Sequence, residues 1–78
     1  MVIITFTIDG VEYQAEEGMT WGEWVDSEYN TDSYYIENTY VRPSAYEEIV
    51  DASNAAQYAN TIILNNATYR VVGAGDSD

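Results

Sequence analysis

The segment at residues 19–29 (MTWGEWVDSEY) constrains the fold most, because it is the clearest helix in the chain and contains both tryptophans. Thr20 and Glu23 match a T-x-x-E capping box, in which each side chain satisfies a backbone N–H of the other residue. Four apolar or aromatic side chains share one helical face: Trp21, Trp24, Val25 and Tyr29. A single short helix of this kind has to pack against a sheet. The sequence therefore predicts an α+β domain with a helix that ends near Tyr29 or Asn30.

Two hairpins are predicted to supply most of that sheet. In residues 2–15, apolar residues alternate with threonine, and Asp9-Gly10 is a favoured two-residue turn. This turn sets a register with three pairs on one apolar face: Ile8 with Val11, Phe6 with Tyr13, and Ile4 with Ala15. Residues 61–72 are predicted to form the second hairpin around Asn65-Asn66. There we expect Leu64 opposite Ala67 and Ile62 opposite Tyr69.

The middle of the chain is predicted to add one further strand. Residues 34–37 and 39–42 indicate either one bent strand or a short hairpin around Asn38. An S-x-x-E capping signal at residues 44–47, followed by residues 48–52, predicts a second short helix of two turns. Residues 53–60 are compatible with a loop or a short helical turn. We expect one compact domain over residues 1–72 and a flexible acidic tail over residues 73–78.

The predicted order at residues 2–29, a hairpin followed by a helix that crosses back over a mixed sheet, resembles the β-grasp arrangement. Ubiquitin-like and ferredoxin-like domains have this arrangement. The cluster cysteines of the ferredoxins are absent here, and so is the terminal Gly-Gly of the conjugating ubiquitin-like proteins. The resemblance therefore implies a fold, and neither activity is implied with it.

The charge of the chain excludes several classes of function. Fourteen carboxylates stand against two cations, Arg42 and Arg70, for a formal net charge of −12. This charge repels nucleic acid and anionic membranes, so we expect direct binding to neither. Histidine, cysteine and lysine are absent, which removes the usual general base, thiolate metal sites and the usual activators of a nucleophile. We expect no enzyme and no cofactor, and, without an export signal at the amino terminus, no secretion.

One acidic segment has the spacing of a calcium-binding loop. Oxygen-bearing side chains occupy positions 1, 3, 5, 7 and 12 of an EF-hand-type pattern, namely Asp26, Glu28, Asn30, Asp32 and Glu37. Thr31 stands where this loop needs a glycine, and Ser33 stands where an aliphatic residue is usual. A calcium-stabilised module is therefore the third hypothesis, against a solvated acidic turn.

The leading hypothesis is an acidic binding surface. Carboxylates interleaved with tyrosines can occupy a groove that normally holds a nucleic-acid backbone, because Lys and Arg bind phosphate and carboxylate alike. The residues predicted to act as phosphate surrogates are Glu12, Glu16, Glu17, Glu23, Asp26, Glu28 and Asp32, with Tyr34 and Tyr35 as flanking anchors. The alternative is a surface that only keeps the protein soluble.

A short, lysine-free, acidic and tyrosine-rich chain also resembles the small accessory proteins of bacteriophages, including anti-CRISPR proteins and other DNA mimics. The residues behind this impression are 5–13 (TFTIDGVEY) and 21–24 (WGEW). The resemblance implies a non-enzymatic inhibitor that acts in the bacterial host cytoplasm on a basic nucleic-acid-binding protein, such as a CRISPR effector. The alternative hypothesis is a structural or assembly module of a phage virion, in a tail, baseplate or capsid decoration. The oligomeric state stays open.

Overall fold

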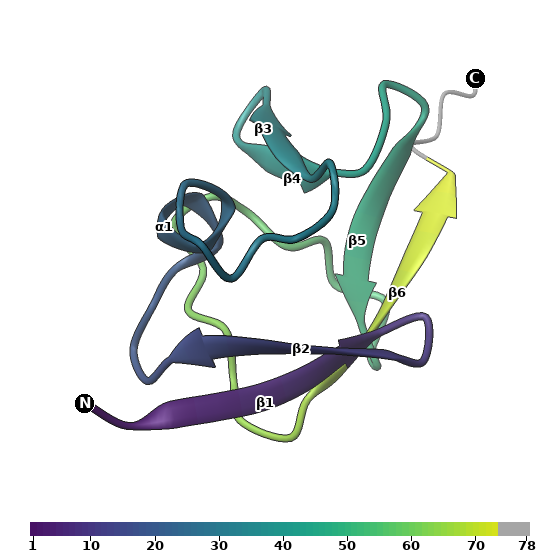
Figure 1. Ribbon diagram of the computed structural model, residues 1–78. Helices are drawn as coiled ribbons and strands as arrows, with labels where there is room; N and C mark the ends of the chain where they lie inside the picture. The colour runs from purple at the N-terminus through teal and green to yellow at the C-terminus, as the bar shows by residue number, and fades with distance from the viewer. Residues whose placement is uncertain (74–78) are drawn as a thin grey trace.

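The first hairpin forms as the sequence predicts. The computed structural model describes residues 1–73, and its first two strands are β1 (Ile3–Ile8) and β2 (Val11–Glu16) (Figure 1). Their antiparallel register contains all three predicted pairs. Asp9 and Gly10 have φ values of 51° and 81°, as a tight two-residue hairpin turn requires. Val11 differs from expectation: it is 54% exposed, because it lies beside the turn at the end of the apolar face.

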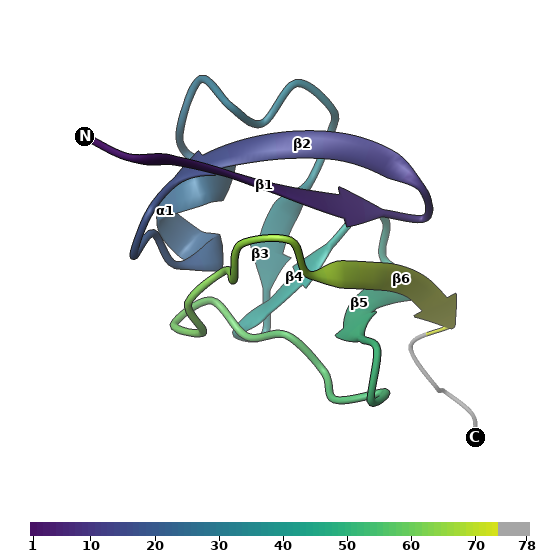
Figure 2. The same ribbon diagram turned by 90° about the horizontal axis from the view of Figure 1, so that it is seen from below.

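The remaining elements complete an α+β fold. They are α1 (Trp21–Val25), β3 (Tyr35–Glu37), β4 (Tyr40–Arg42), β5 (Glu47–Asp51) and β6 (Thr68–Gly73). Four strands form a mixed sheet in the order β2-β1-β6-β5, in which β1 and β6 are parallel and the other neighbours antiparallel. The pair β3–β4 forms a separate antiparallel hairpin. Figure 2 shows α1 and this hairpin lying near the β1–β2 strands and the β5–β6 strands. The β-grasp likeness stays a prediction.

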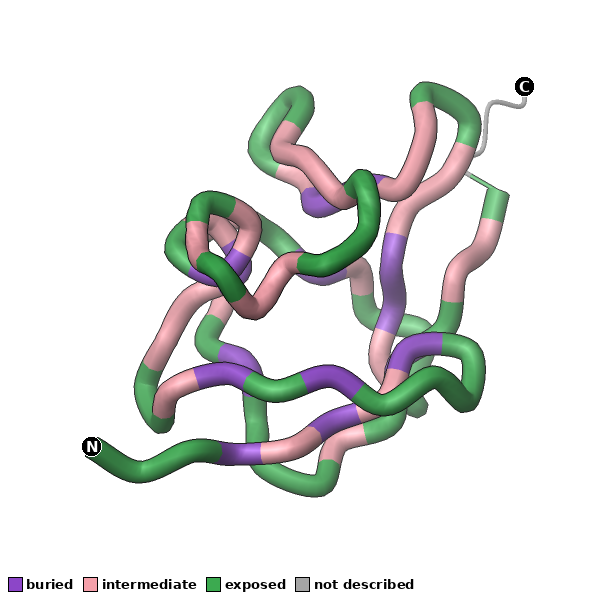
Figure 3. The backbone as a smooth tube through the Cα atoms, in the orientation of Figure 1, coloured by how far each residue is buried: buried purple, intermediate pink, exposed green. Residues whose placement is uncertain are grey.

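The core is organised around the ring of Phe6, which is 1% exposed. Its centroid lies between 5.4 and 6.0 Å from four other aromatic rings, those of Tyr13, Trp21, Trp24 and Tyr69. Both tryptophans of α1 are fully buried in this cluster, which also contains Ile49 of β5 and Val41 of β4. Figure 3 shows the corresponding alternation of buried and exposed residues along β2. Edge-to-face aromatic contacts of this kind stabilise a small core beyond their buried area.

The helix is shorter than predicted. The capping box forms, with the Thr20 hydroxyl accepting from the backbone of Glu23 and the Glu23 carboxylate accepting from the backbone of Thr20. At the other end, the Ser27 backbone N–H and hydroxyl both donate to the carbonyl of Trp24, at 3.0 and 2.6 Å. The amide of Asn30 donates to the carbonyl of Val25 at 3.0 Å. Since polar side chains satisfy the carbonyls of the last turn, the helix ends at Val25 instead of continuing to Tyr29 or Asn30.

The predicted second helix is wrong, because residues 47–51 form strand β5. Ser44 does not cap a helix: its hydroxyl accepts from the backbone of Tyr46 and donates to the Glu47 carboxylate, which closes a turn. Ile49 and Val50 follow, and both are buried. β-branched residues favour a strand, and the pairing of β5 with β6 outweighs the local capping signal.

The predicted second hairpin is also wrong. The turn at Asn65-Asn66 forms, because the Ala67 N–H donates to the Leu64 carbonyl at 3.4 Å, but the flanking segments do not pair. Instead the turn binds β1: the Asn66 N–H donates to the Thr5 carbonyl, and the Asn65 side chain accepts from the Thr5 N–H. The chain therefore continues as β6 parallel to β1.

This change of pairing also reverses the burial of the preceding residues. Ile63 is buried at 1% exposure, whereas Ile62 and Leu64 are 51% and 62% exposed. The predicted facing pairs, Leu64 with Ala67 and Ile62 with Tyr69, are absent from the pairing within residues 1–73. In residues 62–64 the alternating pattern allows either Ile63 or the pair Ile62 and Leu64 to face the core. The contact of the Asn65-Asn66 turn with β1 turns Ile63 inward.

The middle of the chain forms a short hairpin followed, after β5, by a loop. A hairpin forms around Asn38 and Thr39, whose φ values are 53° and 68°. Residues 53–60 form a loop, in which the backbone of Gln57 bonds to both Ile49 and Val41 and so fills the space between β5 and β4. Gly73, which we assigned to the tail, ends β6 opposite Glu47. The rest of the predicted tail, residues 74–78, lies outside the described residues.

Candidate partner-binding surface

The seven predicted carboxylates come from one stretch of the chain: β2, the turn after it, α1 and the loop that follows α1. Residues 9–32 contain eight carboxylates and no arginine, a net charge of −8, whereas residues 33–73 contain four carboxylates and both arginines, a net charge of −2. Six of the seven predicted carboxylates are exposed and Glu16 is half-buried. The exposed six are Glu12, Glu17, Glu23, Asp26, Glu28 and Asp32. The negative charge of residues 1–73 is therefore concentrated on residues 9–32.

Five of these carboxylates line two depressions. The first, which we call the acidic groove, has a volume of about 540 Å³ and is lined by Glu12, Tyr13, Gln14, Glu28, Tyr29 and Thr31. The second has a volume of about 230 Å³ and is lined by Glu16, Glu17, Gly18, Met19 and Glu23. Burial raises the pKa of Tyr29, and the charges of Glu16 and Glu28 raise it further. The pKa of Tyr29 is therefore affected by one carboxylate from each depression.

Asp32 is held by a tyrosine of the core. The hydroxyl of Tyr13 donates a hydrogen bond to the Asp32 carboxylate. Burial raises the pKa of Tyr13, and this hydrogen bond to a carboxylate raises it further. Asp32 thus accepts a hydrogen bond within the protein and is still exposed to a partner. Asp26 lies at the C-cap of α1, outside both depressions.

The two tyrosines predicted as anchors do not lie together on this surface. Tyr34 is half-buried, with its ring 5.9 Å from that of Tyr13 and 5.7 Å from that of Trp24, and burial raises its pKa. Tyr35, on β3, donates its hydroxyl to Glu37 at 3.4 Å. Tyr34 therefore packs against the core, and Tyr35 belongs to a separate polar network.

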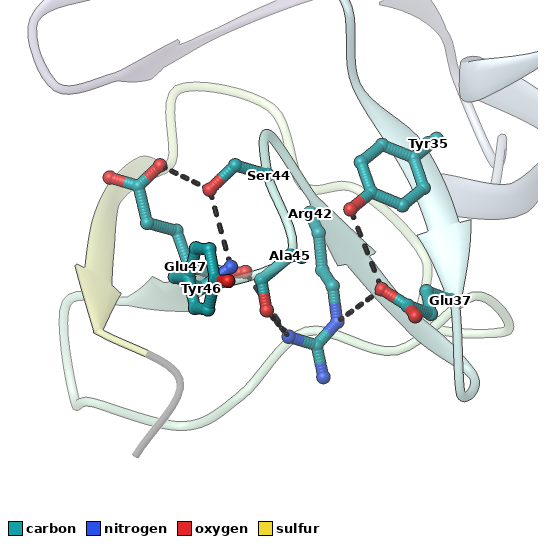
Figure 4. A network of polar contacts seen from close by, with 7 residues as sticks. All are labelled: Tyr35, Glu37, Arg42, Ser44, Ala45, Tyr46 and Glu47. Atoms are coloured by element: carbon teal, nitrogen blue, oxygen red, sulfur yellow. Dashed lines mark hydrogen bonds and ion pairs between the residues drawn. The ribbon is translucent and has the colours of Figure 1, made fainter. Parts of the chain in front are cut away.

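That network also holds Arg42, which is not among the residues that line the acidic groove; Figure 4 shows the polar contacts of the network. Arg42 is 9% exposed, forms an ion pair with Glu37 at 3.9 Å, and donates to the carbonyls of Ala45 and Glu47 at 3.4 and 3.5 Å. Its guanidinium also lies 5.5 Å from the ring centre of Tyr40. The other arginine, Arg70, donates to the side chain of Asn54. Within residues 1–73, neither arginine neutralises the carboxylates of residues 9–32.

The calcium hypothesis finds no support in the arrangement of its five residues. Among the described residues, no three carboxylates lie close enough together to hold a metal ion. Glu37 pairs with Arg42 instead of joining the other four. The Asn30 amide nitrogen donates to the carbonyls of Val25 and Tyr34, while its Oδ1 has no hydrogen-bond partner within residues 1–73. The calcium-stabilised module stays an untested prediction.

Four residues of the acidic groove were not predicted: Tyr13, Gln14, Tyr29 and Thr31. We had placed Tyr29 on the buried face of a longer helix, and the early end of α1 moves it into the loop beside β2. No sequence signal marks these residues, because their role depends on where the helix stops.

Comparisons with protein-family models, curated proteins and solved structures find no match to this chain. No helix within residues 1–73 has the length and the apolar character needed to cross a membrane.

Proposed function

We propose that the protein is a non-enzymatic inhibitor whose acidic surface docks on a basic nucleic-acid-binding surface of another protein. A CRISPR effector in the cytoplasm of a bacterial host is the class of target that we propose, with the protein encoded by a phage. In this proposal the carboxylates take the place of backbone phosphates, because Lys and Arg side chains bind both groups through charge-assisted hydrogen bonds.

The observation that supports this proposal most is the absence of counter-charge. The eight carboxylates of residues 9–32 have no arginine among them, and both arginines of the chain are bonded elsewhere. A surface with unneutralised charge attracts a basic partner over a distance of about 10 Å at moderate salt. A surface evolved for solubility alone does not require five carboxylates to line two depressions.

The rigidity of the scaffold supports the same proposal. β2 presents Glu12 and Glu16 and α1 presents Glu23, and both elements are fixed by the fully buried Trp24 and by Ala15 at 0% exposure. The capping box holds Glu23 in place through its bond to the Thr20 backbone. Side chains on fixed elements lose less conformational entropy when they bind, and this lowers the cost of association.

A second candidate, a structural or assembly module of a virion, is favoured by one observation. Ile62 and Leu64 are 51% and 62% exposed on the loop before β6, and Val2 at the amino terminus is 58% exposed. Apolar side chains on a surface are typical of subunit contacts. Size-exclusion chromatography separates the two candidates, since a stable oligomer of the isolated protein favours assembly and a monomer favours the inhibitor.

The direct test is inhibition of DNA loading. A CRISPR effector bound to its guide RNA is mixed with labelled target DNA and increasing amounts of the protein, and DNA binding is followed by electrophoretic mobility. We expect the wild-type protein to prevent loading, and Glu16→Gln/Glu17→Gln to weaken inhibition by roughly tenfold. Glu23 is left intact in this variant, so the capping box is unaffected.

The chain offers a matched control for that variant. Glu47 and Glu48 are also adjacent glutamates, but they lie on β5, outside both depressions. Glu47→Gln/Glu48→Gln removes the same charge and is expected to keep inhibition within about twofold of wild type. Equal loss of inhibition in both variants would mean that net charge matters and this surface does not.

A further inference from the structure

The outer edge of β2 is an open strand edge. The sheet order β2-β1-β6-β5 leaves β2 without a neighbour on one side, whereas the Gln57 backbone bonds to Ile49 on the outer side of β5. In an antiparallel pair, alternate residues direct their backbone groups away from the partner strand. The Thr5 and Thr7 N–H groups bond on the β6 side, to Asn65 and Ala67, so the residues opposite them direct their backbone groups to the free edge.

Those residues are Gln14, opposite Thr5, and Glu12, opposite Thr7. The Gln14 carbonyl does point outward, because it accepts the indole N–H of Trp24 at 2.8 Å. Within residues 1–73, the backbone N–H groups of Glu12 and Gln14 have no hydrogen-bond acceptor. The Glu12 carbonyl has no donor there. The edge therefore offers two donors and one acceptor in strand geometry.

The acidic groove runs along this same edge. Glu12, Tyr13 and Gln14 form one side of it, and Glu28, Tyr29 and Thr31 of the loop after α1 form the other. Figure 2 shows this loop arching past β2. The unpaired backbone groups thus face a space of about 540 Å³ whose two sides each contribute a carboxylate.

We propose that the acidic groove accepts an extended segment of the partner, with Lys or Arg at alternate positions, as an added strand along the free edge of β2. This inference rests on the proposed function and names the part of the basic partner that is bound. In an antiparallel arrangement, one partner residue exchanges both backbone hydrogen bonds with Glu12, and its side chain lies on the same face as the Glu12 carboxylate. A lysine or arginine at that position pairs with Glu12.

Charge selects this occupant over a second copy of the chain. An added strand from another copy would bring its own acidic β2 residues, Glu12 among them, beside Glu12, and like charges on adjacent strands repel. Charged side chains on an open edge prevent self-association for this reason. A basic segment meets attraction at the same positions.

The reach of the added strand is limited by Trp24. Its indole N–H already donates to the Gln14 carbonyl, and the Glu16 carbonyl accepts from the Met19 N–H at 3.0 Å. These two carbonyls are therefore not free to accept hydrogen bonds from an added strand. The added strand therefore pairs with the half of β2 nearest the Asp9-Gly10 turn.

The test uses a capped peptide of about eight residues in which lysine and threonine alternate. Its control has the same sequence with every backbone nitrogen methylated, so that the charge is kept and the N–H donors are lost. Both are titrated into the full-length protein at about 20 mM salt, where charge contacts are strong, and followed by NMR. We expect the unmethylated peptide to bind at least roughly tenfold more tightly than the methylated one.

Two measurements on the protein side complete the test. Gln14→Pro removes one outward donor at an edge position where proline is tolerated, and we expect it to weaken binding of the unmethylated peptide by about fivefold. Should that variant fail to fold, amide exchange of the wild-type protein is decisive, because the N–H groups of Glu12 and Gln14 should become protected when the peptide binds.

Equal binding of both peptides, or unchanged exchange at Glu12 and Gln14, overturns the strand addition. A contact of charge against charge would then remain, and the DNA-loading assay tests that proposed function separately. Absence of binding by either peptide also overturns the inference. If the wild-type protein binds the unmethylated peptide tightly but does not inhibit DNA loading, the proposed function is contradicted and the strand addition is not.

Discussion

The indole N–H of Trp24 donates to the backbone carbonyl of Gln14 at 2.8 Å, and this bond joins α1 to the open edge of β2. Trp24 is fully buried and Gln14 is exposed, so the bond lies at the boundary between the core and the surface. It connects the core of the protein to the acidic groove, because the same strand lines that groove.

Trp24→Phe should destabilise the protein by about 2 kcal/mol or more, because the substitution leaves the Gln14 carbonyl without its donor and opens space in the core. Urea unfolding followed by circular dichroism measures this loss. Tyr46→Phe is the control, since Tyr46 is 84% exposed, and a change under about 0.5 kcal/mol is expected there. A Trp24→Phe variant as stable as wild type would show that the bond contributes little.

Phe6→Ala should cost about 3–5 kcal/mol, because the ring at the centre of the aromatic cluster is removed. A domain of this size has a total stability of about 4–12 kcal/mol, so the variant should be partly unfolded at 37 °C. Calorimetry measures the loss. Ile62→Ala, at a residue 51% exposed, is expected to melt close to wild type, and equal losses in the two variants would contradict the assignment of the core.

Asn30→Asp should destabilise the protein by about 2 kcal/mol, because Asn30 donates to the carbonyls of Val25 and Tyr34 and a carboxylate has no donor to offer them. Asn30→Ala loses the same two bonds without adding a charge, so we expect it to be the more stable of the two variants. Thermal unfolding of both variants provides the comparison. The reverse order would mean that Asn30 acts mainly through another contact.

Local signals predict those parts of the fold that depend on neighbours in the sequence. The Asp9-Gly10 turn and the alternation of β1 fixed the register of the first hairpin, and Thr20 with Glu23 marked the start of α1. The end of the helix was missed, because Ser27 and Asn30 stop it through side-chain bonds that propensity does not show.

Long-range pairing explains the remaining errors in the fold. Residues 44–52 contain a capping signal, yet β6 is available as a partner and Ile49 is buried between neighbouring segments. Asn65 and Asn66 form the expected turn, but Thr5 of β1 binds it and redirects the chain. Neither partner is visible from the local sequence.

The candidate site follows the same rule. Carboxylates such as Glu12 and Glu28 were predicted from charge alone, and they do meet across one groove. Tyr34 and Tyr35 were predicted together because they are adjacent in sequence, but one packs on the core and the other bonds to Glu37. The open edge of β2 was not predicted, because it depends on the order of strands in the sheet.

Stability should fall as the pH rises above about 10. Burial and the bond to Asp32 raise the pKa of Tyr13 above its ordinary value, so the unfolded chain releases this proton before the folded protein does. The contribution of Tyr13 is therefore complete below pH 10 and is lost as the pH rises toward its folded pKa. Tyr13→Phe should reduce the slope by up to about 1.4 kcal/mol per pH unit.

Urea unfolding between pH 9 and pH 11 measures that slope. Tyr34 and Tyr69, whose pKa values burial also raises, remain in the variant and should keep part of the pH dependence. An unchanged slope in Tyr13→Phe would mean that Tyr13 releases its proton equally readily in both states.

The central claim is that fixed negative charge on residues 9–32 replaces nucleic-acid phosphate on a basic partner. The most direct measurement is the affinity of the protein for a guide-loaded CRISPR effector as a function of salt concentration. We expect the dissociation constant to rise by roughly tenfold or more between about 50 and 200 mM salt, and to rise less steeply for Glu16→Gln/Glu17→Gln. An affinity that is independent of salt, with the same value in that variant, would contradict the claim.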